Sequence, residues 1–217
     1  MKVKQKKETK VSEPKKIAID LACGDRKIDA QSLSMSLQMQ IDEVIGIDSE
    51  KTDSIDIQAN ILEFPWKFAK DNSIDALYTA HFVEHIPMIY WNEGNKLTVL
   101  PQKGSVEMFE KFFEECHRIL KPGGKMRIIC PYYSSIRCWQ DPTHRRAISE
   151  ASFLYLQKEW RELNKLEHCH GKSNFSFVYG HHVAPHINNR NPEFKTNAIT
   201  SDLNAVSDIE VILTKIE

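Results

Sequence analysis

The stretch IAIDLACGDRK, residues 17–27, decides the fold. Its apolar residues are interrupted only by Asp20 and end at Cys23, and Gly24 and several charged residues follow. A short apolar run that ends at a glycine is typical of a buried strand entering a turn. Gly24 has no Cβ, so the turn can approach a ligand closely. We therefore predict the first strand of an α/β sheet, followed by a ligand-binding turn.

The glycine pattern of this turn restricts the ligand. Dinucleotide-binding turns need G-x-G-x-x-G, so that the backbone can wrap the phosphates at a helix N-terminus. Ala22 and Arg26 occupy two of the three glycine positions, and no G-K-[ST] of a P-loop follows. The turn therefore favours a nucleoside ligand without a pyrophosphate.

Alternating strand and helix patterns continue along the chain. Residues 103–120 have apolar side chains at the spacing of one helical face, which predicts a helix. A second helix is predicted over residues 149–160, with Ser149 as its N-cap. Residues 29–39 are predicted to form a weak helix or a loop. We predict a doubly wound, mostly parallel seven-stranded sheet whose last two strands form an antiparallel edge hairpin without a clear helix between them. The predicted strands are 16–22, 42–48, 54–62, 73–82, 125–133, 175–180 and 208–216.

Two long connections, 87–104 and 134–148, fit no regular element. Both follow the carboxyl ends of predicted strands, which is the edge where open α/β sheets bind ligands. Long connections in a compact domain often carry function. We therefore expect substrate-binding residues in these connections.

Composition restricts the setting. The 217 residues are 41% hydrophobic with a net charge of −1, so no global field favours nucleic acid or membranes. Residues 1–16 hold seven lysines and two acids, which predicts a disordered tail, or alternatively a tether to RNA or an acidic partner. The five cysteines form no C-x-x-C pair, and there is neither a signal-peptide core nor an 18-residue apolar run. We therefore expect a cytoplasmic protein.

Five short motifs follow one another between Ile17 and Pro131. In this order they resemble the class I S-adenosylmethionine-dependent methyltransferases, and the resemblance implies a Rossmann-like fold with S-adenosyl-L-methionine as cofactor. It divides the chain into a tail (1–16) and one domain (17–217), in which 17–131 bind the cofactor and 132–217 supply the substrate or lid part. The motifs are IDLACG (19–24), VIGID (44–48), NILEFPW (60–66), IDALYTAHFVEHI (74–86) and HRILKPGG (117–124).

The resemblance also implies the cofactor-binding residues. The turn after the first strand passes under the cofactor. The acid that closes the second strand binds the ribose, and the residues at the end of the third strand flank the adenine. His81 faces the methionine moiety or is a packed strand-end histidine, and His85 is interpreted as structural. Arg26 and Lys27 either contact the cofactor carboxylate or face water. The implied residues are Asp20 (near the ammonium), Ala22, Cys23, Gly24, Asp48, Ser49, Asn60, Ile61 and His81.

The segment WQDPTHRRAIS, residues 139–149, is the densest polar cluster after the fifth predicted strand. We interpret His144 as a general base, Asp141 as the residue that orients it, and Arg145 as the group that holds an anionic part of the acceptor. Alternatively, Asp141 caps the Asp-Pro turn, His144 packs, and the arginines are solvated.

The acceptor is predicted by exclusion. Amino-methylating DNA and protein-glutamine enzymes carry [DN]-P-P-[YF] where this chain has TAHF, residues 79–82. We predict a small-molecule, sugar or nucleotide-type acceptor and do not expect nucleic acid as a partner. The alternatives are an RNA methyltransferase that uses the basic tail, or a cofactor-binding protein without catalysis. Trp91, Trp139 and the pair 132–133 are interpreted as core, with an acceptor pocket as the alternative.

A second histidine-rich segment matches no metal-binding spacing. Neighbouring residues on a strand point to opposite faces, so His181 and His182 cannot easily share one ion. We expect a lid or a structural role and no metal ligands. The segment holds His168, Cys169, His170, His181, His182 and His186.

Overall fold

The structure is a computed structural model that describes residues 14–92, 97–100, 105–166 and 171–217. The predicted disordered tail, 1–16, lies almost entirely outside the described residues, and so do His168, Cys169 and His170. Within the described part of the chain, no helix combines the length and the apolar character needed to cross a membrane.

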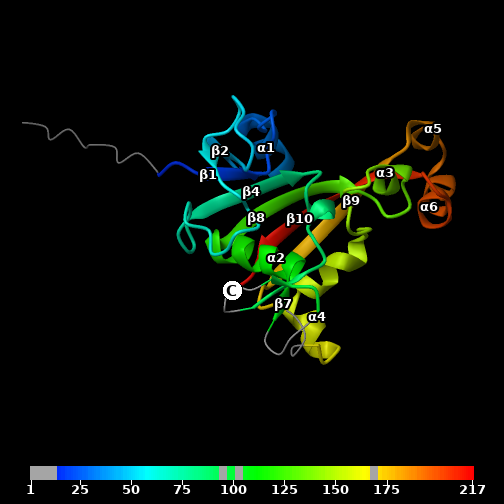
Figure 1. The fold of residues 1–217 in the computed structure, drawn as a ribbon. Coiled ribbons are helices and arrows are strands. Elements are labelled where there is room, and N and C mark those ends of the chain that lie inside the picture. The colour runs from blue at the N-terminus through cyan, green and yellow to red at the C-terminus, as the bar shows by residue number, and fades with distance from the viewer. Residues whose placement is uncertain (1–13, 93–96, 101–104, 167–170) are drawn as a thin grey trace, which may run out of the picture.

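A seven-stranded sheet forms the centre of the molecule, in the order β3-β2-β1-β4-β8-β10-β9 (Figure 1). The first five strands in this order, from β3 to β8, run parallel to one another, whereas β10 is antiparallel to both of its neighbours, β8 and β9. The predicted mostly parallel α/β sheet with an antiparallel edge pair is therefore confirmed. The strands are β1 (Ile17–Leu21), β2 (Glu43–Asp48), β3 (Ile57–Gln58), β4 (Ile74–Ala80), β8 (Leu120–Pro131), β9 (Phe175–Val183) and β10 (Val206–Lys215).

Two helices cover opposite faces of the sheet because strand side chains alternate. Ala18 of β1 packs with Leu33 of α1 (Ala30–Leu37), whereas its neighbours Ile19 and Leu21 belong to the larger cluster of α2 (Met108–Ile119). The predicted helical face of α2 is buried, including Phe112. The core is thus two apolar layers on one sheet.

Three boundaries differ from prediction. The third strand, predicted over 54–62, is limited to two residues, because the Asn60 side chain accepts the Leu62 N–H (3.0 Å) and turns the chain away. β8 begins before the predicted 125–133 and continues through the glycines of KPGG, where Gly123 has φ 73° and the register to β4 shifts. Residues 149–160 form a 3₁₀ helix, η2 (Glu150–Leu156), followed by α4 (Lys158–Leu163).

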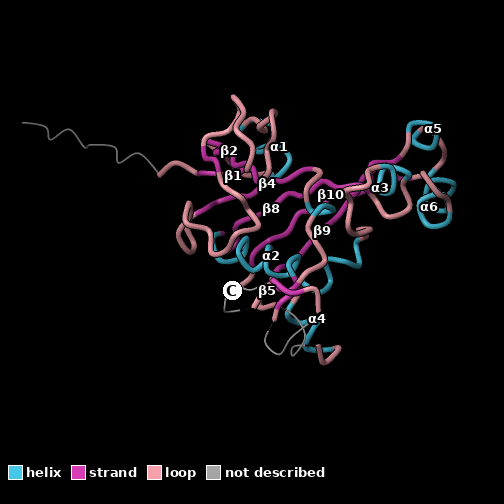
Figure 2. The backbone as a smooth tube through the Cα atoms, in the orientation of Figure 1, coloured by secondary structure: helices cyan, strands magenta, loops and turns pink. Residues whose placement is uncertain are grey.

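The predicted direct connection between the last two strands is wrong. Two helices, α5 (Pro185–Asn188) and α6 (Pro192–Ser201), separate β9 from β10. A proline opens each helix. The small core beneath them consists of buried Ile187, Ala198 and Ala205 with partly buried Val183 and Ala184, so the apolar pattern was too weak to predict the helices. Figure 2 shows both helices at the end of the molecule where α3 (Ile136–Gln140) lies.

The two long connections contain short elements. The connection after β4 begins with the 3₁₀ helix η1 (Val83–His85) and continues into a small sheet of order β6-β5-β7. The connection after β8 contains α3 and a loop that reaches Ile148. The small sheet consists of β5 (Tyr90–Trp91), β6 (Leu97–Thr98) and β7 (Val106–Glu107).

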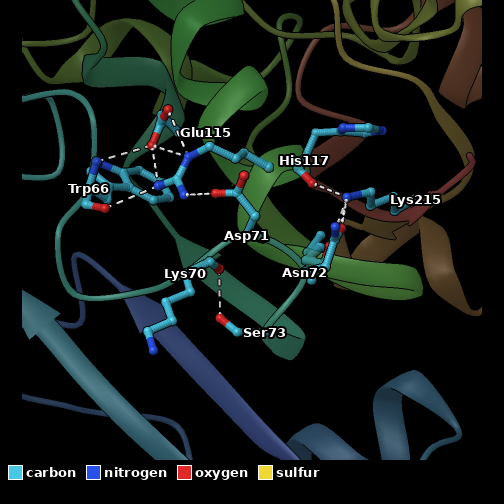
Figure 3. A network of polar contacts seen from close by, with 10 residues as sticks. Trp66, Lys70, Asp71, Asn72, Ser73, Glu115, His117 and Lys215 are labelled. Carbon is cyan, nitrogen blue, oxygen red and sulfur yellow. Dashed lines mark hydrogen bonds and ion pairs between the residues drawn. The ribbon is translucent and has the colours of Figure 1, made fainter.

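Polar contacts close the edge of the sheet where β4 begins and β10 ends (Figure 3). The Lys215 ammonium donates to Asn72 Oδ1 (2.6 Å) and to the carbonyls of His117 (2.6 Å) and Leu120 (2.9 Å). Glu115 accepts from the Trp66 N–H at 3.0 Å and from a neighbouring arginine of α2. These bonds fix the end of α2 to the sheet, so the ends of the parallel strands available for function are the opposite, carboxyl ends.

Candidate active site

The carboxyl ends of β1, β2, β4 and β8 meet at one edge of the sheet, because these strands run parallel and are neighbours. The segments that follow them carry most of the predicted site residues. Neighbouring strands are about 4.8 Å apart, so side chains after β1 and β4 lie within reach of one ligand.

The turn after β1 has an unusual backbone. Ala22 and Gly24 both have φ 57°, the left-handed region that favours glycine. The Gly24 N–H donates to Asp48 Oδ2 (2.9 Å), and Thr52 Oγ1 donates to the Gly24 carbonyl (2.8 Å), so the turn is fixed to the end of β2. A Cβ built on Gly24 would meet no atom within 4 Å, which leaves open space beside the turn for a ligand.

Asp20 places a buried carboxyl group beneath this turn. Only 2% of the residue is exposed, and Oδ2 accepts the Ile28 N–H at 2.8 Å. Burial raises the pKa of the Asp20 carboxyl to about 7, and this outweighs the opposing hydrogen bond. A cation beside Asp20 would offset the desolvation of the carboxylate. This residue and the open turn fit the ammonium and the nucleoside of S-adenosyl-L-methionine.

Lys27 is held in an ion pair at this edge of the sheet. Its ammonium pairs with Asp56 at 2.6 Å, and its stem lies against Gly46. Arg26 is exposed. Of the two open interpretations for this pair, the structure thus places Lys27 in an ion pair and Arg26 in solvent.

The other predicted cofactor residues differ in their surroundings. Asp48 Oδ1 accepts the Glu50 N–H (3.0 Å) and lies 3.5 Å from the exposed Ser49 hydroxyl. The Asn60 amide is occupied locally, since it also donates to Glu63 (3.2 Å). Asp48 thus joins Gly24 at the edge of the sheet, whereas the side chain of Asn60 serves its own turn.

Two further predicted residues, Cys23 and Ile61, are packed into the protein. Ile61 is 4% exposed in the core, and its carbonyl accepts from Trp66 Nε1 (3.0 Å). Cys23 is buried, and burial raises the pKa of its thiol to about 11. The described cysteines, Cys23, Cys116, Cys130 and Cys138, are free and buried.

His81 follows β4 and has φ 54°, a conformation that costs energy for a residue with a Cβ. Its N–H donates to the Ile129 carbonyl (2.8 Å), which holds the residue beside the end of β8. Nδ1 lies 3.7 Å from Glu84 Oε1, and interaction with Glu84 raises the pKa of the His81 imidazole. The side chain is 44% exposed, so His81 is accessible to solvent at the carboxyl end of β4.

The loop after β8 folds back onto η1. His144 Nδ1 lies 2.8 Å from the Cys138 carbonyl, and its ring packs edge-on against His85 at 4.7 Å between centroids. Asp141 Oδ2 is 3.9 Å from His144 Nε2, beyond hydrogen-bond distance, so the carbonyl of Cys138 orients this histidine. Asp141 instead holds Thr143, whose N–H and hydroxyl both donate to Oδ1 at 2.7 Å.

The two arginines of this loop have different surroundings. The Arg145 N–H donates to the Glu84 carbonyl (2.8 Å), while its side chain is exposed and contacts only the Pro142 carbonyl (3.1 Å) in the described part of the chain. Arg146 is paired with Glu107 at 2.6 Å and lies over an aromatic ring of α2. Arg145 is therefore the arginine available to a ligand.

The structure brings together residues that sequence reasoning did not combine. Glu84, His85 and Thr143 join His81 and His144 at the ends of β4 and β8. The VEHI segment was the available signal, but its histidine was interpreted as structural. A link between His85 and Thr143, 58 positions apart, has no local sequence signature.

The described part of the second histidine-rich segment is divided between two environments. His181 packs on Tyr132 (4.9 Å between ring centroids), whereas His182 Nε2 is 3.1 Å from Glu210. His186 is exposed on α5. These histidines contact different groups, as expected for neighbours on a strand.

Comparison with known proteins identifies the family. The model of the family described as "Methyltransferase domain" matches residues 19–128, from β1 into β8. No curated protein matches the chain.

Solved structures resemble the chain over nearly its whole length. A SAM-dependent methyltransferase from Archaeoglobus fulgidus is 17% identical with a TM-score of 0.55, covering 93% of this chain and 86% of that chain. A methyltransferase from Haloferax volcanii, in complex with the Trm112 methyltransferase activator, is 14% identical with a TM-score of 0.49 (95% and 85% covered). Phosphoethanolamine N-methyltransferase 2 from Haemonchus contortus, in complex with S-adenosyl-L-methionine, is 13% identical with a TM-score of 0.44 (96% and 50% covered).

The first of these similarities shows the shared fold. The family match covers the first turn, the ends of β2 and β4, and the lead-in to β8, which are the parts of the edge described above. The chain belongs to the methyltransferase domain family and is an enzyme that uses S-adenosyl-L-methionine.

Proposed function

We propose that the enzyme transfers the methyl group of S-adenosyl-L-methionine to an oxygen or nitrogen of a small-molecule, sugar or nucleotide-type acceptor. The observation that carries the proposal is the convergence of His144, His85 and Glu84 at the carboxyl ends of β4 and β8, beside His81. The transfer needs an acceptor atom in line with the sulfur–methyl bond, and orientation is the main task of the protein.

On the cofactor side, Asp20 balances the ammonium and Asp48 accepts the ribose hydroxyls. Ala22 and Gly24 let the turn pass under the cofactor, with Cys23 packed behind them. The predicted cofactor-binding set is completed by Ser49, Asn60, Ile61 and His81. Asn60 and Ile61 contribute the backbone of their turn to the binding site. The buried carboxyl of Asp20 and the open space at Gly24 support this arrangement.

On the acceptor side, residues 132–217 supply the groups. His144 activates the acceptor, Arg145 holds an anionic substituent, and Asp141 positions the loop through Thr143. Trp139 is 68% exposed, although it was interpreted as core, and it flanks this loop. Its exposed ring supports an acceptor with an apolar or aromatic face.

The test has two stages. Calorimetry should first show binding of S-adenosyl-L-methionine and S-adenosylhomocysteine to the full chain. Formation of S-adenosylhomocysteine is then measured with panels of hydroxyl- and amine-bearing metabolites, sugars and nucleotides. His144→Ala should reduce turnover at least about 100-fold, within the range of acid–base contributions, while cofactor affinity stays within about twofold.

The matched control is His186→Ala, which removes an exposed histidine of α5 and should leave turnover unchanged. Absence of cofactor binding would contradict the whole assignment. Methylation of RNA alone, lost on deletion of residues 1–16, would contradict the acceptor class. Cofactor binding without turnover on any panel would favour the non-catalytic alternative.

A further inference from the structure

We propose that Glu84, His85 and His144 bind a divalent transition-metal ion of the Zn²⁺ type. One ligand atom from each residue lies within 4.8 Å of the other two. In the tetrahedral geometry of Zn²⁺, two ligand atoms that each lie about 2.0–2.2 Å from the ion are about 3.3–3.6 Å apart. His144 Nε2 and Glu84 Oε1 are 3.9 Å apart, so an approach of about half an ångström brings them to that distance.

The carboxylate of Glu84 is the independent observation that points to a cation. The residue is 1% exposed, and neither Oε1 nor Oε2 has a hydrogen-bond partner in the described part of the chain. Burial of a carboxylate without partners is costly, so such groups are paired or coordinate metals. His81, at 3.7 Å, and His144, at 3.9 Å, stand too far away to hydrogen-bond it.

The hydrogen bonds of His144 leave its Nε2 available as a ligand. Its Nδ1 faces the Cys138 carbonyl at 2.8 Å, and a carbonyl oxygen can only accept. Nδ1 therefore carries the proton, and the lone pair is on Nε2, which faces Glu84. A backbone carbonyl that fixes the tautomer is a common outer partner of a metal-bound histidine.

The same argument applies to His85 through Thr143. The Thr143 hydroxyl has one proton, which it donates to Asp141 Oδ1 at 2.7 Å. Toward His85 Nδ1, at 3.0 Å, the hydroxyl oxygen is then an acceptor, so Nδ1 carries the proton and Nε2 keeps its lone pair. Asp141 and Thr143 thus form an outer chain that orients His85 as a metal ligand, which makes both of them positioning residues.

The donor set determines the class of ion. Two imidazole nitrogens and one carboxylate are the ligands of catalytic zinc sites and of non-haem iron sites, which keep open positions. Such a set is unsuited to Mg²⁺ or Ca²⁺, which prefer oxygen ligands. An open position at this edge would face the acceptor.

The consequence for chemistry rests on the proposed function. A bound divalent ion lowers the pKa of a hydroxyl that coordinates it, so the acceptor can lose its proton to solvent near neutral pH. The oxygen then forms a bond to the methyl carbon as the sulfur–carbon bond breaks, and the bonding pair remains on sulfur as S-adenosylhomocysteine leaves. His144 would activate the acceptor as a ligand of the ion.

The test measures metal binding without cofactor or acceptor. The full chain is stripped with a chelator and titrated with Zn²⁺ in competition with a chromophoric chelator, and Co²⁺ binding is followed by its visible absorption bands. Glu84→Gln and His144→Ala should each weaken Zn²⁺ binding at least about 100-fold and remove the Co²⁺ bands. Thr143→Val, on an exposed part of the loop, should weaken binding about 10–100-fold, as outer-shell changes do.

His182→Ala is the matched control, because it removes an exposed histidine outside the cluster and should bind Zn²⁺ as the parent chain does. Unfolding in urea verifies that each variant is folded. Equal Zn²⁺ affinity and equal Co²⁺ spectra in the parent chain and Glu84→Gln would overturn the proposal, as would absence of Zn²⁺ binding below millimolar concentration. Turnover that survives complete metal removal would overturn the role of the ion while leaving the methyltransferase assignment intact.

Discussion

Asp48 Oδ2 accepts the backbone N–H of Gly24 at 2.9 Å, which joins the end of β2 to the turn after β1. The carboxylate also accepts the Glu50 N–H at 3.0 Å, so its orientation is fixed from both sides. The residue proposed to bind the ribose therefore also holds the turn that is proposed to lie under the cofactor.

Replacement of Asp48 should weaken cofactor binding. Asp48→Ala removes the charge-assisted hydrogen bonds to the ribose. The loss of one such bond costs about 1.5–3 kcal/mol, so the dissociation constant of S-adenosyl-L-methionine should rise at least about 10–100-fold by calorimetry. Asp53→Ala, an exposed acid in the following turn, is the control and should change affinity less than about twofold. Equal affinities for the two variants would contradict the ribose role.

Cofactor binding should depend on pH through Asp20. In the folded enzyme without cofactor, the Asp20 carboxyl has a pKa of about 7. A cationic ammonium beside this carboxyl favours its ionised form. Binding should therefore release a proton below about pH 7, and affinity should rise with pH and level off above it. Calorimetry in buffers of different ionisation enthalpy measures the proton release. Asp20→Asn should bind more weakly without this pH dependence.

Stability should show the opposite trend in the cofactor-free enzyme. The pKa of Asp20 is raised in the folded state from 3.8 to about 7, so its contribution is fully present below pH 3.8 and is lost as pH rises to 7. Each pKa unit corresponds to about 1.4 kcal/mol, and the loss should be of that order or a small multiple of it. In urea unfolding, Asp20→Asn should match the parent chain near pH 4 and exceed it at pH 8. An unchanged difference across this range would contradict the raised pKa.

Ala22→Gly should stabilise the protein. The left-handed conformation costs a residue with a Cβ about 1–2 kcal/mol, whereas glycine loses about 0.5–1 kcal/mol more backbone entropy on folding. The net gain should reach about 1 kcal/mol, seen as a higher urea midpoint. Ala198→Gly, inside α6, should lower the midpoint instead. A lower midpoint for Ala22→Gly would show that the methyl group of Ala22 is needed for packing.

Lys215→Met should destabilise the fold without affecting the cofactor. It leaves Asn72 Oδ1 and two carbonyls of the α2 end without their donor, at a cost of about 1–3 kcal/mol. Lys158→Met, an exposed lysine of α4, should change the unfolding free energy by less than about 0.5 kcal/mol. A similar small change for Lys215→Met would mean that water replaces the ammonium.

The strands and the turn of residues 17–48 could be predicted from the sequence because their signals are local. A buried strand, a turn and an acid at the next strand end lie within single motifs, as at Asp20 and Asp48. For the end of the chain, the sequence predicted only that the last two strands form an antiparallel pair at the edge of the sheet. The helices α5 and α6 between them were not predicted, because they bury little apolar surface.

The acceptor half depends on contacts between distant segments. The surroundings of His85, for example, depend on Thr143, which lies in the loop after β8. Likewise, Asp141 was predicted to orient His144, but the backbone carbonyl of Cys138 occupies that position. The position of a backbone carbonyl such as that of Cys138 does not depend on its side chain, so no residue pattern predicts that it faces His144.

The position of β10 between β8 and β9 has a consequence for synthesis. β9 is made before β10, yet it pairs within this sheet only with β10. While the chain leaves the ribosome, β1 to β8 can assemble and offer a cofactor-binding turn, but β9 has no place in the sheet until β10 emerges. Since chains acquire structure from the N-terminus during translation, a cofactor that binds early stabilises the nascent half-sheet. The strand that gives β9 its place in the sheet is thus translated after it.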